Sequence, residues 1–266
     1  MSALAIGLVL LAAAVHATWN LRLHGAEDRV AVIAVAGIVS GAMLFPFVLV
    51  DPPVEVVGWI AVSTAAEIVY GLSLAAAYRR GDLSLTYPVG RGLAPVLATI
   101  GAWVALGERP PAIALLGAVC MAVGLALLGW EARRARSLEA FAFALLVAVT
   151  VAIYSVVDAD AVTMTGPLGY LAFPLFLSGV AEGAMIRFDR SRLRAAIRTG
   201  FVVGLGSCVA YGLVLFAFRL SPVGPVTTLR EVSVLIAVGL AAERVTLRRW
   251  VGVGACLVGA ILAAVS

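Results

Sequence analysis

Ten long apolar segments, separated by short charged or Pro- and Gly-containing breaks, dominate this sequence of 266 residues. A helix that crosses the hydrocarbon core of a bilayer needs about 20 mostly apolar residues, and the segments are close to that length. Ten such helices leave only short connections and no room for a globular domain. The sequence therefore predicts an all-α integral membrane protein with ten transmembrane helices. The expected helices lie near 2–21, 30–50, 56–78, 84–106, 110–130, 138–157, 167–187, 199–219, 223–241 and 247–265.

Composition excludes the other broad classes. Hydrophobic residues make up 63% of the chain and charged residues 13%, whereas about 25% of a soluble domain is charged. The apolar excess excludes disorder, and the runs are longer than the ~10-residue alternating strands of a membrane barrel. The first segment lacks the basic start of a signal peptide, so we expect a retained helix. Cys120, Cys208 and Cys256 each stand alone in an apolar run, which indicates packing residues rather than a disulfide framework or a metal site.

The basic residues, all of them arginine, predict the orientation. Fifteen of the 19 fall in the connections after the first, third, fifth, seventh and ninth segments, and only Arg109 and Arg219 fall in the other set. By the positive-inside rule, the arginine-rich connections are cytoplasmic and both termini lie outside. We therefore expect a multi-pass protein of the cell (inner or plasma) membrane. The basic balance is interpreted as a topology signal that favours anionic lipids, not as a nucleic-acid site.

An internal repeat divides the chain near its middle. Leu10-Leu11 through Trp19-Asn20 resembles Leu145-Leu146 through Tyr154-Ser155, and Gly107-Glu108-Arg109 resembles Ala242-Glu243-Arg244, both at an offset of 135. The expected units are two five-helix repeats, residues 1–135 and 136–266. Because five is odd, the second unit enters the membrane in the opposite sense, and the repeats are inverted. Inverted repeats let the two halves of a transporter exchange conformations around a central site.

Several motifs resemble one family, the drug/metabolite transporter superfamily of EamA type, over nearly the whole chain. They are His16-Ala17-Thr18-Trp19-Asn20, the segment from Tyr78 to Gly92, Leu106-Gly107-Glu108-Arg109, the segment from Leu229 to Leu235, and Ala242-Glu243-Arg244. The resemblance implies ten helices in two repeats and, by analogy alone, export. Many members of that family have cytoplasmic termini, so the arginine distribution here is a departure.

Ionisable residues inside the apolar segments are the candidate functional residues, because each costs at least about 2.5–3.5 kcal/mol to insert. Glu67 lies near the middle of its segment, with Tyr70 and Gly71 on the same helical face. Its carboxyl group could exchange a proton, bind a cationic group, or form a structural ion pair with Arg91 or another helix. Glu67 is our candidate for coupling or substrate polarity.

Two arginines correspond to each other at an offset of 139, Arg91 and Arg230. Arg91 lies about 10 Å inside its helix, with Tyr87 one turn earlier. Guanidinium groups bind carboxylates and phosphates in a bidentate manner, so a symmetric pair beside a cavity would suit an anionic or zwitterionic solute. The alternative is permanent pairing within the protein, with Glu231 or Glu182 as a partner of Arg230.

His16 is a weaker candidate for proton handling or substrate contact, and Tyr211 is a modest cavity candidate that shares a face with Ser207. We interpret Trp19 first as part of the interfacial aromatic belt. Asp158 and Glu182 are interpreted first as interfacial charges, and Glu108 as a helix-end group. Gly117, Gly124, Gly252 and Gly259 are expected to permit close helix packing.

The sequence carries no nucleophile-base set, no nucleotide-binding loop and no metal-ligand spacing, so we predict neither an enzyme nor a cofactor. The expected function is secondary active transport of a small organic metabolite or drug-like solute by alternating access, with proton coupling as one source of energy. The alternatives are a carrier or flippase of polyprenyl-phosphate-linked lipids and a non-transporting membrane assembly partner. Substrate identity and oligomeric state are open.

Overall fold

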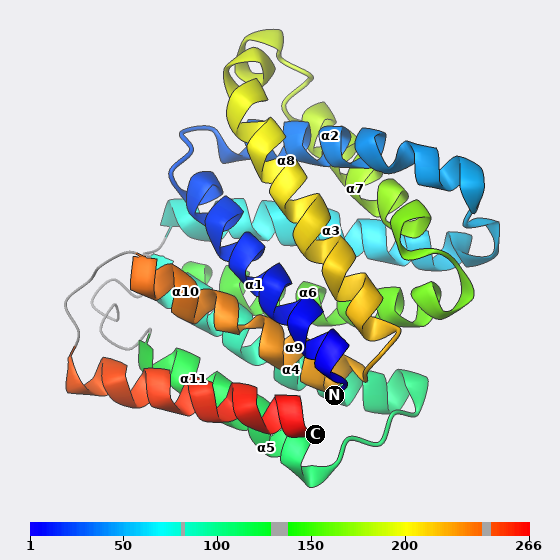
Figure 1. Ribbon diagram of the computed structural model, residues 1–266. Helices are drawn as coiled ribbons and strands as arrows, with labels where there is room; N and C mark the ends of the chain where they lie inside the picture. The colour runs from blue at the N-terminus through cyan, green and yellow to red at the C-terminus, as the bar shows by residue number, and fades with distance from the viewer. Residues whose placement is uncertain (81–82, 129–137, 241–245) are drawn as a thin grey trace.

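The described part of the protein is built of helices alone. A computed structural model describes the chain outside residues 81–82, 129–137 and 241–245, and no strand occurs within the described residues (Figure 1). The elements in chain order are α1 (Ala3–His24), α2 (Arg29–Val50), the 3-10 helix η1 (Val54–Val56), α3 (Val57–Arg80), α4 (Leu83–Leu106), α5 (Ala112–Leu128), α6 (Leu138–Met164), α7 (Pro167–Met185), α8 (Arg190–Phe218), α9 (Val223–Arg230), α10 (Val232–Leu240) and α11 (Leu247–Val265).

Where the structure describes them, the ten apolar segments are helical, and three of them differ from expectation in extent. The segment expected over 138–157 continues to Met164, and the segment expected over 199–219 begins at Arg190. Asp189 explains the earlier start, because its carboxylate accepts the backbone N–H groups of Ser191 and Arg192 at 2.9 and 3.1 Å. The Ser191 hydroxyl and these N–H groups hold the pKa of Asp189 below its ordinary value.

The third difference is a break in the segment expected over 223–241. Helix α9 ends at Arg230, Glu231 forms a turn, and α10 begins at Val232. At the break, the N–H group of Glu231 bonds to the carbonyl oxygen of Thr228 at 3.2 Å, three residues back instead of four. The positively charged Arg230 side chain belongs to the last turn of α9, where the negative end of the helix dipole stabilises a positive charge.

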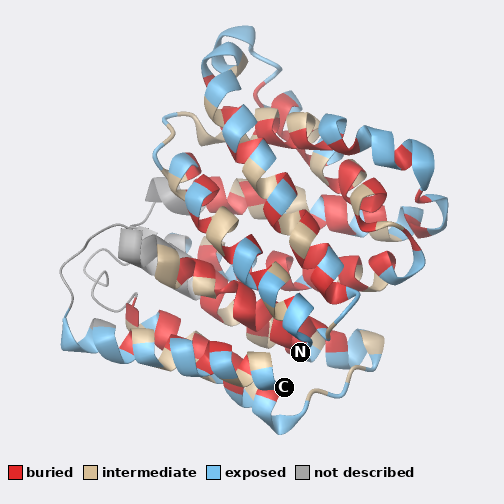
Figure 2. Cartoon of the chain, viewed as in Figure 1, coloured by how far each residue is buried: buried red, intermediate tan, exposed pale blue. Residues whose placement is uncertain are grey.

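Among the described residues, six helical segments are long and apolar enough to cross a membrane: α1, α2, the segment Val54–Ala76, α6, α7 and α8. Shorter apolar stretches lie in three further helices, over Gly90–Leu106, Ala112–Leu128 and Trp250–Val265. Large apolar side chains such as Leu49, Val104 and Ile261 are exposed. Exposed residues lie along the outward faces of the helices (Figure 2). A multi-pass membrane protein has this distribution of exposed apolar surface, because lipid takes the place of water there.

The two halves of the chain are interleaved. The closest helix pairs join one half to the other, namely α2 with α7, α5 with α11, α4 with α6, α3 with α6, α1 with α8 and α2 with α8. The expected boundary at 135/136 lies outside the described residues. Because helices of one half pack between helices of the other, the cavity described below has walls from both halves.

Glycines bring two of these helix pairs into backbone contact. A Cβ atom added to Gly37 of α2 would lie 2.8 Å from Cα of Gly179 in α7. A Cβ atom on Gly259 of α11 would lie 2.7 Å from the carbonyl oxygen of Gly117 in α5, and one on Gly124 would lie 2.7 Å from that of Gly252. The expected role of the glycines in α5 and α11 is confirmed, since larger residues would force these helices apart.

Candidate functional site

A cavity of about 130 Å³ lies inside the bundle. Its walls come from α1, α2, α3, α6, α7, α8 and α9, and its polar lining residues are His16, Glu67, Tyr70, Tyr154, Ser178, Glu182, Ser207, Tyr211 and Arg230. We call the end of the bundle with connections 25–28 and 186–189 the arginine-rich end, and the other the opposite end. On α1 the lining runs from Ala12 to Leu23, and on α3 from Glu67 to Leu74. The cavity therefore lies toward the arginine-rich end.

Glu67 is placed on the cavity wall by α3, as its face predicted. Tyr70 and Gly71, three and four residues later, line the same cavity. The Glu67 side chain is half-buried, and the Ser178 hydroxyl of α7 lies beside it. The ion pair weighed for Glu67 with Arg91 is not formed, because Arg91 pairs with another residue. The carboxyl group therefore faces the cavity without a described cationic side chain bound to it.

Glu182 is a second carboxyl group in the same cavity, and its interpretation as an interfacial charge is wrong. Its side chain is 4% exposed and lines the cavity from α7. Its Oε1 atom occupies the space where a Cβ atom of Gly71 would project, so the glycine on α3 makes room for the acid on α7. Glu182 shares its helical face with Leu175 and Ser178, which also line the cavity, but only the packing of α7 against α2 and α3 shows that this face turns inward.

Asp158 is also buried rather than interfacial, because α6 continues one and a half turns past it. Its carboxylate accepts hydrogen bonds from the phenol groups of Tyr170, at 2.6 Å, and Tyr211. Tyr211 lines the cavity, so its hydrogen bond to Asp158 fixes the position of one of the lining rings. The sequence carried no local signal for these partners, which come from α7 and α8.

Aromatic rings form a continuous side of the cavity. The rings of Tyr70 and Tyr154 lie 6.0 Å apart, and those of Tyr154 and Tyr211 lie 5.4 Å apart, both edge to face. The His16 and Trp19 rings are in contact at 4.6 Å. Trp19 is 9% exposed and lines the cavity, so its interpretation as part of the interfacial belt is wrong.

The two arginines expected to flank a cavity have separate environments. Arg91 is 3% exposed and binds Glu231, with Nε 2.8 Å from Oε2. Arg230 lines the cavity, and its Nε lies 4.0 Å from Oε1 of the same carboxylate, too far for a hydrogen bond. Nε and Nη2 of Arg230 are buried without a hydrogen-bond partner among the described residues. The Arg230 guanidinium lies over the Tyr211 ring at 6.0 Å.

Of the predicted site residues, five line the cavity, namely His16, Glu67, Tyr70, Tyr211 and Arg230. Arg91 is buried but does not line it, and Tyr87 lies among the residues whose side chains are not described. Within the described residues, no group of three or more His, Cys, Asp or Glu side chains could hold a metal ion. The cavity brings charged side chains of both signs together.

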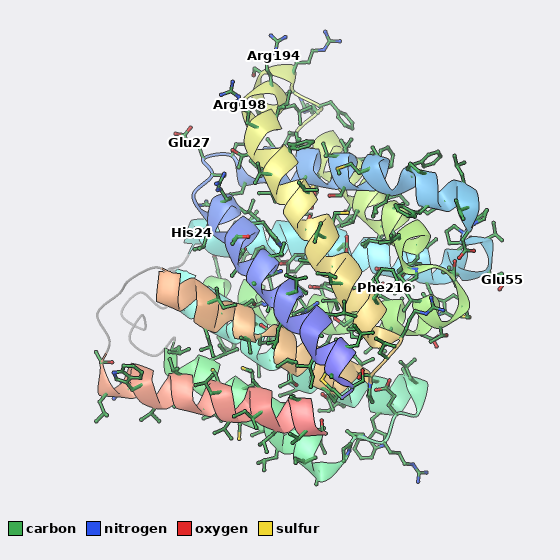
Figure 3. All side chains as sticks on the ribbon, in the orientation of Figure 1. His24, Glu27, Glu55, Arg194, Arg198 and Phe216 are labelled. Carbon is green, nitrogen blue, oxygen red and sulfur yellow. The ribbon has the colours of Figure 1, made fainter. Side chains whose placement is uncertain are left out.

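The opposite end is tied across the two halves by carboxylates that accept backbone N–H groups. Asp51 accepts from Gly166 at 2.6 Å, and Glu108 accepts from Val223 at 3.1 Å. Burial raises the pKa of Glu108, and the bond from Val223 opposes that rise. At the arginine-rich end, Arg192 and Asp28 form an exposed ion pair at 2.6 Å. In Figure 3, Arg194 and Arg198 project near the start of α8, and Glu55 lies at the right-hand edge of the view, in the connection between α2 and α3.

Comparison with known proteins gives a structural likeness alone. No family model and no curated protein matches the chain. The chain is similar to a protein of known crystal structure with a TM-score of 0.74, over 98% of this chain and 97% of that one, at 16% sequence identity. At that identity the likeness shows that the whole chain has a fold already seen in a solved structure.

Proposed function

We propose that the protein is a secondary transporter that moves a small organic solute across the cell membrane by alternating access. The observation that carries the proposal is the cavity, which places charged side chains of both signs, Glu67, Glu182 and Arg230, inside an apolar helical bundle. Burying such groups is costly, so their retention indicates a ligand. An assembly partner requires no such cavity. A volume of about 130 Å³ suits a solute near the size of benzene, which favours a small solute over a polyprenyl chain.

Ten membrane spans in two inverted repeats form part of the proposal. The packing pattern supports it. If α1, α2, α3, α4 and α5 correspond to α6, α7, α8, α9 with α10, and α11, each close helix pair corresponds to another close pair or to itself. The contact of α1 with α8 corresponds to that of α3 with α6, and the contact of α4 with α6 to those of α1 with α9 and α10. Helices α2 and α7 pair with each other as counterparts, as do α5 and α11. The resemblance to EamA-type transporters adds the same expectation.

The orientation follows from the arginine distribution. If the arginine-rich end is cytoplasmic, the cavity lies toward the cytoplasm, and the end closed by the Asp51 and Glu108 hydrogen bonds faces outward. A large core cluster that includes Val56, Tyr170 and Val223 fills that outer half. Alternating access requires these contacts to open while the arginine-rich end closes. Export is the direction that the resemblance implies.

Locking the opposite end tests the proposal. A Cβ atom on Gly166 would lie 3.7 Å from Cβ of Asp51, a separation typical of disulfides. Asp51→Cys with Gly166→Cys, in a background with Cys120, Cys208 and Cys256 replaced by serine, should cross-link without distortion. In proteoliposomes, counterflow of a solute found by thermal-shift screening should stop when the bond forms and return on reduction. The single cysteine variants are the matched controls. Undiminished counterflow through the oxidised protein would refute alternating access at this end.

We assign the coupling of solute transport to proton movement to Glu67, whose carboxyl group faces the cavity. A carboxyl that carries a proton across the membrane must be able to lose it, and an amide cannot. Glu67→Gln should therefore abolish transport driven by a pH gradient and leave counterflow exchange intact. Glu55→Gln, at an exposed glutamate, is the control. If pH-driven transport survives in Glu67→Gln, another group couples the protein.

A further inference from the structure

Helix α8 is longer than a bilayer requires, and its excess length is basic. Its 29 residues, Arg190–Phe218, extend about 43 Å at about 1.5 Å per residue, whereas the hydrocarbon core of a bilayer is about 30 Å thick. The difference of about 13 Å corresponds to roughly nine residues. The segment Arg190–Arg198, which has that length, contains four arginines. When the apolar remainder of α8 spans the core, this segment lies at the level of the lipid phosphates.

The arginines of this segment divide between two faces of the helix. Arg192 turns toward the start of α2, where its Nε and Nη2 atoms donate to the Asp28 carboxylate at 2.6 and 3.0 Å. Arg190, Arg194 and Arg198 are spaced four residues apart, so they follow one another along a different face. All three are exposed, and no carboxylate among the described residues pairs with them. Arg194 and Arg198 project away from the bundle (Figure 3).

The face that carries these three arginines continues into apolar surface. Ile197, Phe201 and Leu205 follow Arg194 by three, seven and eleven residues, a spacing that keeps them on its side of the helix. Their side chains are exposed, at 53%, 49% and 41%. Guanidinium groups therefore give way to apolar side chains toward the membrane interior, and a phospholipid has the same order of head group and acyl chains. We call this face the α8 stripe, and its residues are Arg190, Arg194, Ile197, Arg198, Phe201 and Leu205.

We propose that the α8 stripe binds an anionic phospholipid from the leaflet at the arginine-rich end. The lipid phosphate lies between Arg194 and Arg198, and the acyl chains lie along Phe201 and Leu205. Guanidinium groups bind phosphate through charge-assisted, bidentate hydrogen bonds. The two arginines favour a head group of net negative charge, because a choline group would bring another cation to the same place. The exposed apolar side chains favour a lipid over a free phosphate. This binding takes place on the lipid-facing surface and depends neither on transport nor on the cavity.

Native mass spectrometry of the full-length protein in a neutral detergent tests the class of ligand. The probes are dioleoyl-phosphatidylglycerol, dioleoyl-phosphatidylcholine and glycerol 3-phosphate, since the two lipids share their acyl chains and the third probe has none. Each arginine near an anionic membrane surface strengthens binding by about fivefold, so phosphatidylglycerol should bind at least about fivefold more tightly than either other probe. Equal binding of phosphatidylcholine would overturn selection by charge, and equal binding of glycerol 3-phosphate would overturn a lipid site. Failure of phosphatidylglycerol to bind would overturn the proposal altogether.

Variants locate the lipid on the stripe. Arg194→Gln should weaken phosphatidylglycerol binding by about fivefold, and Arg194→Gln with Arg198→Gln by about 25-fold. Arg192→Gln removes the same charge from the other face of the same helical segment and should weaken binding less. Arg109→Gln with Arg219→Gln, at two exposed arginines of the opposite end, is the control for the double variant and should bind as the wild type does. Unchanged binding in the double variant, or equal weakening by a variant and its control, would overturn the α8 stripe as the site.

Discussion

Arg91 and Arg230 correspond to each other in the sequence but differ in what surrounds them. The residue that follows is Gly92 in one half and Glu231 in the other. Two buried guanidinium groups therefore share one carboxylate, which binds Arg91 at 2.8 Å and lies 4.0 Å from Arg230. The two positions thus differ in role: Arg91 forms a structural ion pair, whereas Arg230 faces the cavity. The glutamate that makes this difference follows Arg230 and has no counterpart after Arg91. Repetition of a residue in a duplicated chain does not imply repetition of its role.

Removing the carboxylate that the two arginines share should change the stability of the protein more than any other variant proposed here. Glu231→Gln removes the 2.8 Å ion pair between Arg91 and Glu231, and breaking a buried pair costs about 3–5 kcal/mol. We expect a comparable loss in the free energy of unfolding, measured by denaturant titration of the protein in detergent. Glu55→Gln, at an exposed position, should leave it unchanged. A small effect of Glu231→Gln would mean that Arg91 has an equally good partner elsewhere.

Removing each arginine separately should sharpen the comparison. Arg91→Gln leaves Glu231 without its 2.8 Å partner, whereas Arg230→Gln leaves the Arg91–Glu231 pair intact. Arg91→Gln should therefore destabilise the fold by at least about 2 kcal/mol more than Arg230→Gln. The same unfolding measurement distinguishes them. Equal losses for the two variants would contradict the division of roles.

The hydrogen bonds that hold Tyr211 near Arg230 should contribute less to the free energy of unfolding than the ion pair does. Tyr211→Phe keeps the ring near Arg230 and removes one of the two phenol groups that donate to Asp158. Loss of a buried hydrogen bond to a carboxylate costs about 1–3 kcal/mol. Tyr170→Phe removes the other donor and should cost a similar amount, but only Tyr211→Phe should also alter solute binding. Unchanged stability in both variants would show that Asp158 does not depend on these bonds.

The exposed ion pair between Arg192 and Asp28 should matter least. Both side chains are open to solvent, at 42% and 35% exposure, so water and salt screen their attraction. Arg192→Gln should shift the melting temperature less than Glu231→Gln, Arg91→Gln or Tyr211→Phe, and added salt should reduce the shift further. A shift as large as that of Glu231→Gln would contradict this ranking.

Helical periodicity was sufficient to predict part of the site. Glu67 and Tyr70 share a face because they are three residues apart. An ionisable residue in the middle of a long apolar segment is expected to face the interior of the bundle, because contact with lipid is costly. Arg230 and His16 were identified on the same grounds, and both line the cavity. The all-helical fold followed from the apolar segments alone.

The remaining site residues depend on contacts that periodicity does not encode. Asp158 was assigned to a helix end because the extent of α6 beyond it was not apparent from the sequence. Glu182 and Trp19 lie near helix ends, and only the neighbouring helices decide whether such a residue turns inward or toward the surface. The pairing of Glu231 with Arg91 rather than Arg230 depends on distances of 2.8 and 4.0 Å between separate helices.

The glycine contacts of α2 with α7 and of α5 with α11 have a mechanical consequence. At each crossing, backbone lies against backbone, as the 2.8 Å and 2.7 Å approaches of an added Cβ atom indicate. Interdigitated side chains must disengage before two helices can turn against each other, but bare backbones have none to disengage. If the two halves turn against each other, as alternating access requires, these two crossings therefore present few side chains that must disengage.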